Sequence, residues 1–211
     1  MKKIKFIDLF AGMGGTRIGF ETAAHKLGFN TECVLTSEIK PHAVEALKSN
    51  FNGENICGDI REIQTNQIPD FDVLLGGFPC QSFSTAGKGL GFLDTRGTLF
   101  FEIERILKEK MPKAFMLENV RNLVAHDGGK TFKIIRSHLE ALGYTVYAKV
   151  LNALDYGVPQ KRERIIIVGF KDTLFFTFPD PLPLSKRKKL TDVLEQNVPE
   201  KYYVRDQIRE S

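Results

Sequence analysis

Short runs of apolar residues alternate along this chain with segments of helical periodicity, and this alternation constrains the fold more than any other feature. The runs are nearly continuous, which is typical of strands buried on both faces of a parallel sheet. Repeated strand–helix units predict an α/β fold with a doubly wound, mostly parallel sheet. The last two runs follow each other without a helix, so we expect an antiparallel last strand. The expected strands are 4–10, 32–38, 54–60, 71–77, 113–120, 144–152 and 164–170, and the expected helices are 16–28, 42–51, 97–110 and 130–143.

Length and composition indicate one main domain. The chain has 211 residues and is 42% hydrophobic, enough for a sizeable core. We expect this domain to span 1–172, because the following stretch, FPDPLPLSKRKK, has the proline and charge content of a linker, which would occupy 173–211. No apolar run reaches the roughly 18 residues of a membrane span. The first apolar run does not read as a secretory signal peptide, because Asp8 interrupts it and no small-residue cleavage pattern follows. We therefore expect a cytoplasmic protein without membrane partners.

Charge and cysteine content narrow the possible partners and cofactors. The three cysteines form no CxxC pair, which argues against a disulfide framework and against a zinc site. The net charge of +4 permits a polyanionic partner but does not demonstrate one. The basic clusters at 160–164 and 186–189 are also typical of ordinary solvated surface.

A glycine-rich turn, DLFAGMGG, joins the first expected strand to the first expected helix. Open α/β sheets bind ligands at the carboxyl ends of their strands, where such a turn lies. Glycines in the turn let the backbone come close to the ligand. The turn alone is a weak signal, because folds that bind NAD, FAD and S-adenosylmethionine all contain one. Glu38 and Asp59, expected at the ends of the second and third strands, could accept from ribose hydroxyls and an adenine amine. The G-x-G-G spacing without a following lysine favours an adenosine with a small tail over phosphates.

Cys80 stands in the segment GGFPCQSFS, directly after the fourth expected strand. Pro79 fixes the backbone before it, and no histidine has the context of a cysteine hydrolase. Glu118, in FMLENV, ends the fifth strand at the same edge, so a thiol and a carboxylic acid could flank one small ring. Arg162 and Arg164, in QKRER, would point to one face if they alternate as strand residues do. An ordinary buried cysteine and a charged strand edge are the structural alternatives.

Taken in order, these segments resemble the cytosine-5 DNA methyltransferases of bacterial restriction–modification systems. The resemblance covers about residues 4–170, and five blocks in sequence make it more specific than any one motif. It implies the Rossmann-like fold of S-adenosylmethionine-dependent methyltransferases. It also implies an enzyme that methylates carbon 5 of a flipped-out cytosine in double-stranded DNA. The blocks are DLFAGMGG, GGFPCQSFS, DTRGTLFFE, FMLENV and LNALDYGVPQKRERIIIVGF.

The resemblance also implies roles for single residues. Cys80 would attack carbon 6 of cytosine, and Glu118 would hold or protonate ring nitrogen 3. Arg162 and Arg164 would support the cytosine oxygen and the catalytic loop, which would run from 81 to 97 and close over DNA. No metal is needed. The residues expected to hold S-adenosylmethionine are Phe10, Ala11, Gly12, Gly14, Gly15, Glu38, Ile39, Asp59, Ile60, Pro79 and Leu99.

The family continues past the last block with a target-recognition region and a returning C-terminal segment. We therefore expect 173–211 to begin the recognition region, and the chain alone to bind cofactor weakly and methylate DNA poorly. A missing C-terminal part or a second polypeptide would supply the rest. Two alternatives remain: a tRNA cytosine-5 methyltransferase, and a non-catalytic DNA-binding or scaffold subunit. An NAD oxidoreductase is disfavoured by the glycine spacing and leaves Cys80 unexplained.

Overall fold

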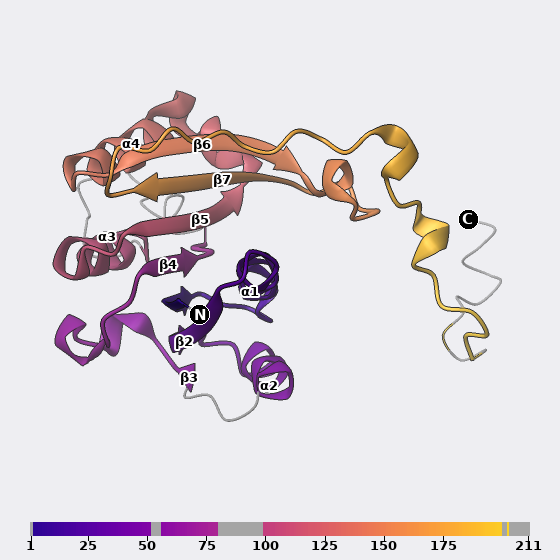
Figure 1. The fold of residues 1–211 in the computed structure, drawn as a ribbon, viewed down its shortest axis with the longest axis horizontal. Helices are drawn as coiled ribbons and strands as arrows, with labels where there is room; N and C mark the ends of the chain where they lie inside the picture. The colour runs from indigo at the N-terminus through magenta and orange to yellow at the C-terminus, as the bar shows by residue number, and fades with distance from the viewer. Residues whose placement is uncertain (1, 52–55, 80–98, 200–201, 203–211) are drawn as a thin grey trace. The chain divides into compact units, whose positions relative to one another are not determined.

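The computed structural model describes residues 2–51, 56–79, 99–199 and 202. Within them lies a seven-stranded sheet in the order β3-β2-β1-β4-β5-β7-β6 (Figure 1). Neighbouring strands from β3 to β5 are parallel, whereas β7 runs antiparallel to β5. The strands are β1 (Lys3–Leu9), β2 (Asn30–Ser37), β3 (Ile56–Cys57), β4 (Val73–Gly76), β5 (Ala114–Val120), β6 (Thr145–Asn152) and β7 (Glu163–Phe170).

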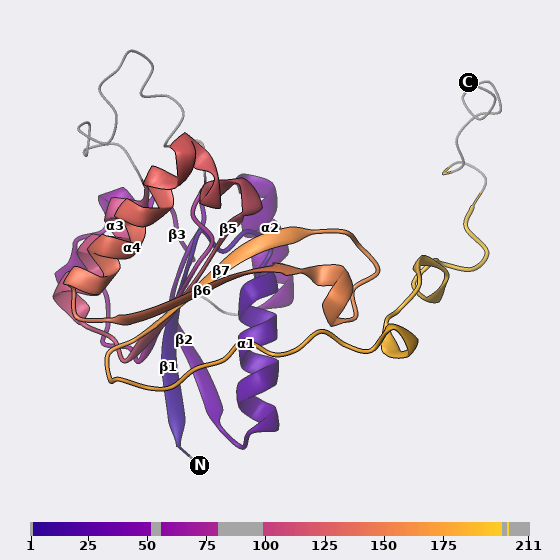
Figure 2. The same ribbon diagram turned by 90° about the horizontal axis from the view of Figure 1, so that it is seen from above.

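Helices cover both faces of the sheet, with α1 and α2 on one face and α3 and α4 on the other (Figure 2). Their bounds are α1 (Gly15–Lys26), α2 (Pro41–Asn50), α3 (Leu99–Lys110) and α4 (Lys130–Ala141). Strand order reverses between β1 and β4. The fold is therefore the expected doubly wound, mostly parallel sheet with an antiparallel last strand.

Helix α3 shows how the sequence determines this packing. Its apolar side chains recur at helical spacing, and all four that face the sheet are buried. Lys108 and Lys110 stand in its last turn, where positive charge favours the negative end of the helix dipole. The buried positions are Phe100, Ile103, Ile106 and Leu107.

The third strand ends earlier than expected. The sequence indicated a strand over 54–60, of which 54 and 55 lie outside the described residues, but β3 (Ile56–Cys57) ends at Cys57 and a 3-10 helix, η1 (Ile60–Glu62), follows it. Asp59 is the N-cap of η1 and accepts from the backbone N of Arg61 at 3.0 Å. Asp59 therefore stands in a cap after the strand and not within it.

Phe115 of β5 packs its ring against Gly169 of β7. The two residues are directly opposite in the antiparallel ladder. A Cβ atom at Gly169 would lie 2.2 Å from two ring atoms of Phe115, so only glycine leaves room for the ring. The same ring meets Tyr144 edge-on with centroids 5.1 Å apart, which joins β5, β7 and the loop after α4 in one cluster.

Replacing Gly169 by alanine should lower the free energy of unfolding by about 1–3 kcal/mol, because the buried Phe115 ring must shift. Urea unfolding followed by circular dichroism measures the change. The matched control is Gly19→Ala in α1, where a Cβ atom would meet nothing within 4 Å. It should stabilise by about 0.5–1 kcal/mol, since alanine favours a helix. Equal effects of the two variants would contradict the packing argument.

The chain divides into two compact units, Met1–Leu151 with Glu163–Phe178, and Asn152–Arg162 with Pro179–Ser211. Described contacts within the second unit include an Asp155–Arg187 ion pair and a hydrogen bond from the Tyr156 hydroxyl to the Pro179 carbonyl at 3.0 Å. The division expected after residue 172 stays a prediction. Among the described helices, none has the length and apolar character to cross a bilayer.

Candidate functional site

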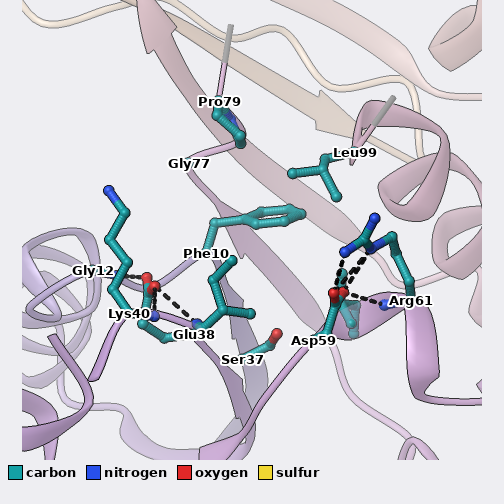
Figure 3. A pocket seen from close by; sticks show the side chains of 12 residues that line it. Phe10, Gly12, Ser37, Glu38, Lys40, Asp59, Arg61, Gly77, Pro79 and Leu99 are labelled. Carbon is teal, nitrogen blue, oxygen red and sulfur yellow. Dashed lines mark hydrogen bonds and ion pairs between the residues drawn. The ribbon is translucent and has the colours of Figure 1, made fainter. Parts of the chain in front are cut away.

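A cavity of about 380 Å³ opens at the carboxyl edge of the sheet. Its walls come from the loops that follow β1, β2, β3 and β4 and from the first turn of α3 (Figure 3). This edge, where strand order reverses, is the usual ligand site of open α/β sheets. The lining residues are Phe10, Gly12, Ser37, Glu38, Ile39, Lys40, Asp59, Ile60, Arg61, Gly77, Pro79 and Leu99.

Most of the residues expected to hold a nucleoside line this cavity, but three do not. Ala11 donates its backbone N to the Ser37 carbonyl at 3.1 Å, and Gly15 begins α1. Gly14, at φ +84°, packs against Phe51, whose ring a Cβ atom would approach to 2.4 Å. These three residues therefore shape the turn beneath the cavity. Those that line it are Phe10, Gly12, Glu38, Ile39, Asp59, Ile60, Pro79 and Leu99.

Glu38 is fixed by three backbone amides. Its Oε2 accepts from Gly12 N at 2.8 Å. Its Oε1 accepts from Ile39 N and Lys40 N, both at 2.9 Å. Because a carboxylate oxygen can accept two hydrogen bonds, these contacts fill Oε1 and leave Oε2 able to accept from a further donor. Glu38 therefore ties the glycine turn to the end of β2 and can still bind a ligand hydroxyl.

Asp59 forms an ion pair with Arg61 on the other side of the cavity (Figure 3). The Arg61 guanidinium donates through Nε to Oδ1 at 3.0 Å and through Nη2 to Oδ2. These hydrogen bonds lower the pKa of the Asp59 carboxyl below its usual value. The carboxylate is therefore ionised at neutral pH. Each of its oxygens already accepts two hydrogen bonds from Arg61, so an exocyclic amine would replace one of these bonds.

Phe10 places an aromatic ring between the two carboxylates (Figure 3). Its φ of 56° lies in the left-handed region, which is rare for a bulky side chain and costs about 1–3 kcal/mol. Such strain commonly marks a functional position. An aromatic face flanked by Glu38 and Asp59 suits a nucleoside, whose ring can stack while its hydroxyls and amine donate.

Glu118 and Arg164 form a second constellation beside the cavity. Arg164 Nε lies 2.8 Å from Glu118 Oε1, and about a quarter of each side chain is exposed. Antiparallel pairing sets Arg164 opposite Val120, so the start of β7 meets the carboxyl edge of β5. Glu118 Oε2 lies 3.8 Å from the Cβ position of Gly77, a residue of the cavity lining. The carboxyl group and the cavity therefore adjoin across Gly77.

Asn119 anchors the chain where it leaves β4. Its side-chain amide donates to the Phe78 carbonyl at 2.8 Å, and its side-chain oxygen accepts from Val120 N at 2.8 Å. Asn119 is 2% exposed, and its bond to the Phe78 carbonyl is buried, whereas the bond from Val120 N is partly buried. Phe78 precedes the Pro79–Cys80 pair, but Cys80 and the loop expected at 81–97 lie outside the described residues.

Arg162 does not share a strand with Arg164, because β7 begins at Glu163. It belongs to the second unit, where its backbone N donates to Asn152 Oδ1 at 3.1 Å. The alternation expected for the two arginines therefore does not apply. Sequence reasoning also missed four lining residues, each within two positions of an expected one. They are Ser37, Lys40, Arg61 and Gly77.

The chain is similar to known proteins over nearly its whole length. The profile of the family "C-5 cytosine-specific DNA methylase" matches residues 4–211. The type II methyltransferase M.HaeII of Haemophilus aegyptius is 56% identical over 99% of the chain and 64% of its own length. M.NlaIV of Neisseria lactamica is 54% identical over 94% of the chain and 48% of its own length. The chain thus spans about half to two thirds of these relatives.

A solved structure shares the fold. A mutant of DNMT2 from Spodoptera frugiperda superposes with a TM-score of 0.75 at 23% identity, over 94% of this chain and 61% of the other. At this identity the likeness concerns the fold, and it agrees with the doubly wound sheet described above.

Proposed function

The chain belongs to the C-5 cytosine-specific DNA methylase family, and on this premise we propose that it takes part in methyl transfer from S-adenosylmethionine to carbon 5 of cytosine in double-stranded DNA. One observation carries the proposal: a nucleoside-sized cavity adjoins the Glu118–Arg164 pair across Gly77. A methyl donor in the cavity and a base held by Glu118 would then be neighbours at one edge of the sheet.

S-adenosylmethionine fits the cavity by its hydrogen-bonding groups. Its adenine amine and ribose hydroxyls are donors, and the cavity presents two carboxylates. We assign Asp59 and Ile60 to the adenine, Glu38 to the ribose and Phe10 to stacking on the ring. We assign the methionine part to Gly12 and the apolar walls to Ile39, Pro79 and Leu99. When bound, the cofactor supplies an electrophilic methyl group on a sulfonium.

The chain's own residues would activate the cytosine. The Cys80 thiolate forms a bond to carbon 6, which makes carbon 5 nucleophilic. Glu118 gives a proton to ring nitrogen 3, and Arg164 holds the Glu118 carboxyl in place. After carbon 5 has taken the methyl group, its proton passes to water. The carbon–sulfur bond then breaks, Cys80 leaves as thiolate, and ring nitrogen 3 returns its proton to Glu118. Carbon 5 is unreachable within a duplex, so the base must be flipped out.

Transfer of tritiated methyl groups tests this function. The purified chain is incubated with S-adenosylmethionine and mixed-sequence duplex DNA, alone and with a polypeptide that carries the region of the relatives outside the match. Methylation of DNA at cytosine carbon 5 in either arm supports the proposal. Transfer to tRNA but not to DNA, or no transfer to DNA in either arm, would contradict it.

Replacing Asn119 by alanine should lower both stability and activity. The variant leaves the buried Phe78 carbonyl without this partner, at about 1–3 kcal/mol for the unsatisfied group, and it also removes the partly buried bond from Val120 N. The backbone that leads to Cys80 should also lose its anchor. Formation of the covalent adduct between Cys80 and DNA that contains 5-fluorocytosine should therefore slow by more than the loss of stability explains. Urea unfolding and single-turnover trapping measure the two effects. A stable variant that traps DNA at the normal rate would exclude this anchoring role.

A further inference from the structure

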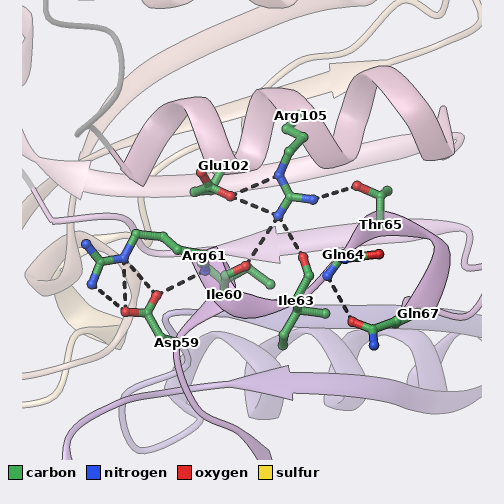
Figure 4. A network of polar contacts seen from close by, with 9 residues as sticks. All are labelled: Asp59, Ile60, Arg61, Ile63, Gln64, Thr65, Gln67, Glu102 and Arg105. Atoms are coloured by element: carbon green, nitrogen blue, oxygen red, sulfur yellow. Dashed lines mark hydrogen bonds and ion pairs between the residues drawn. The ribbon is translucent and has the colours of Figure 1, made fainter.

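Arg105 on α3 is the centre of a polar network that reaches the loop after β3 (Figure 4). Its Nη2 donates to the carbonyl oxygens of Ile60 at 3.3 Å and Ile63 at 3.0 Å. Its Nη1 donates to the Thr65 hydroxyl, and its Nε donates to Glu102 Oε2 at 3.0 Å. One guanidinium thus joins α3 to three groups of the loop.

The segment after β3 consists of two short 3-10 helices, η1 (Ile60–Glu62) and η2 (Thr65–Gln67). Asp59 of the cavity lining caps η1 and Ile60 of the lining begins it, whereas Thr65 begins η2. Ile60 and Thr65 are 1% and 5% exposed, so the loop is packed against the core on the side where Arg105 enters. A planar guanidinium donates in fixed directions, so it sets the relative positions of the groups that accept from it.

Helix α3 carries a residue of the cavity as well. Leu99 at its first position lines the same cavity as Asp59 and Ile60, and Arg105 lies further along the same helix. Because a helix is stiff, the bonds of Arg105 relate the position of Leu99 to that of the Asp59–Ile60 segment. Two segments of the cavity lining are therefore related through one side chain that does not itself line the cavity.

We propose that Arg105 is a positioning residue for cofactor recognition, which holds the Asp59 carboxylate where the adenine amine must donate. The inference rests on the proposed function, since it concerns the same cavity. A residue that only supports the fold would weaken every ligand alike, whereas a positioning residue should affect the ligands that use Asp59.

Calorimetric titration of the full chain with two ligands separates these roles without measuring catalysis. The first is S-adenosylhomocysteine, and the second is its analogue in which purine replaces adenine and the 6-amino group is missing. In Arg105→Gln the Kd of the first should rise about tenfold, and that of the second less than about twofold, because only the first loses a hydrogen bond to a charged group. Arg105→Lys should resemble Arg105→Gln, since an ammonium cannot hold the three loop groups in one plane.

Arg136→Gln is the matched control. Arg136 also lies on a helix, pairs with Glu140 four residues on at 2.7 Å and donates to the Val146 carbonyl of β6, but it is not part of the cavity lining. It should change neither Kd. If Arg105→Gln does not fold, Thr65→Val removes a single arm of the network and should raise the first Kd alone by about threefold.

Equal weakening of both ligands, or of neither, would overturn the positioning role. If the unaltered chain binds the purine analogue as tightly as S-adenosylhomocysteine, Asp59 does not read the amine and the inference also fails. If the unaltered chain binds neither ligand, the proposed function itself fails, and the inference with it.

Discussion

Methyl transfer should be abolished when Cys80 is replaced by alanine, with a fall of about 10⁴-fold or more, as is usual when a nucleophile is removed. Carbon 5 of cytosine is a poor nucleophile until a thiolate adds to carbon 6, so no neighbouring side chain can replace the sulfur. Initial rates of tritiated methyl transfer measure the loss. Duplex DNA with 5-fluorocytosine gives a second readout, because fluorine cannot leave carbon 5 as the proton does and the covalent adduct persists.

Cys57→Ala is the matched control for the nucleophile. Cys57 is a free thiol in β3 at the same edge of the sheet, and burial raises the pKa of its thiol, which makes it a poor nucleophile at neutral pH. Its removal should leave trapping intact. A Cys80→Ala variant that still forms the adduct, or a Cys57→Ala variant that does not, would refute the assignment of the nucleophile.

Replacing Glu118 by glutamine should lower methyl transfer by about 10²–10⁴-fold, the usual effect of removing a positioned proton donor. Glutamine keeps the shape of the side chain but cannot give a proton to ring nitrogen 3, and it leaves Arg164 without the carboxylate 2.8 Å away. Cofactor affinity should change little, since Glu118 is not part of the cavity lining. Single-turnover rates and calorimetry measure the two quantities.

Glu163→Gln is the control for charge alone. Glu163 is the first residue of β7 and pairs with Arg121 at 2.8 Å, about as closely as Glu118 pairs with Arg164. That pair is more exposed, and exposed pairs contribute about 0–1 kcal/mol. The variant should therefore keep nearly full activity. If it lost as much activity as Glu118→Gln, the local charge and not the proton donor would explain the result.

The sheet and its helices could be predicted because each signal is local. Continuous apolar runs identified the strands, and the spacing of apolar residues identified helices such as α3. Because the carboxyl ends of parallel strands meet at one edge of the sheet, Glu38 and Asp59 could be assigned to that edge. The exit from β3 was less predictable, because the side chain of Asp59 caps η1 and ends the strand early.

Other parts of the site depend on contacts that no local pattern contains. Arg105 belongs to an ordinary amphipathic helix in sequence, and its partner Thr65 is 40 residues away. Arg61 reads as a surface charge until its pairing with Asp59 is seen. Arg164 was expected at the start of the last strand, but its contact with Glu118 requires the register of β7 against β5.

That register has a consequence for how remote substitutions should behave. The Phe115 ring packs against Gly169 near one end of the β5–β7 ladder and allows only the observed register. Arg164 lies at the other end of the same ladder. A slip of two residues would carry the guanidinium about 7 Å along the strand, beyond reach of its carboxylate. A substitution at Gly169 that shifts this register should therefore separate Arg164 from Glu118 and lower activity, although Gly169 itself lies outside the site.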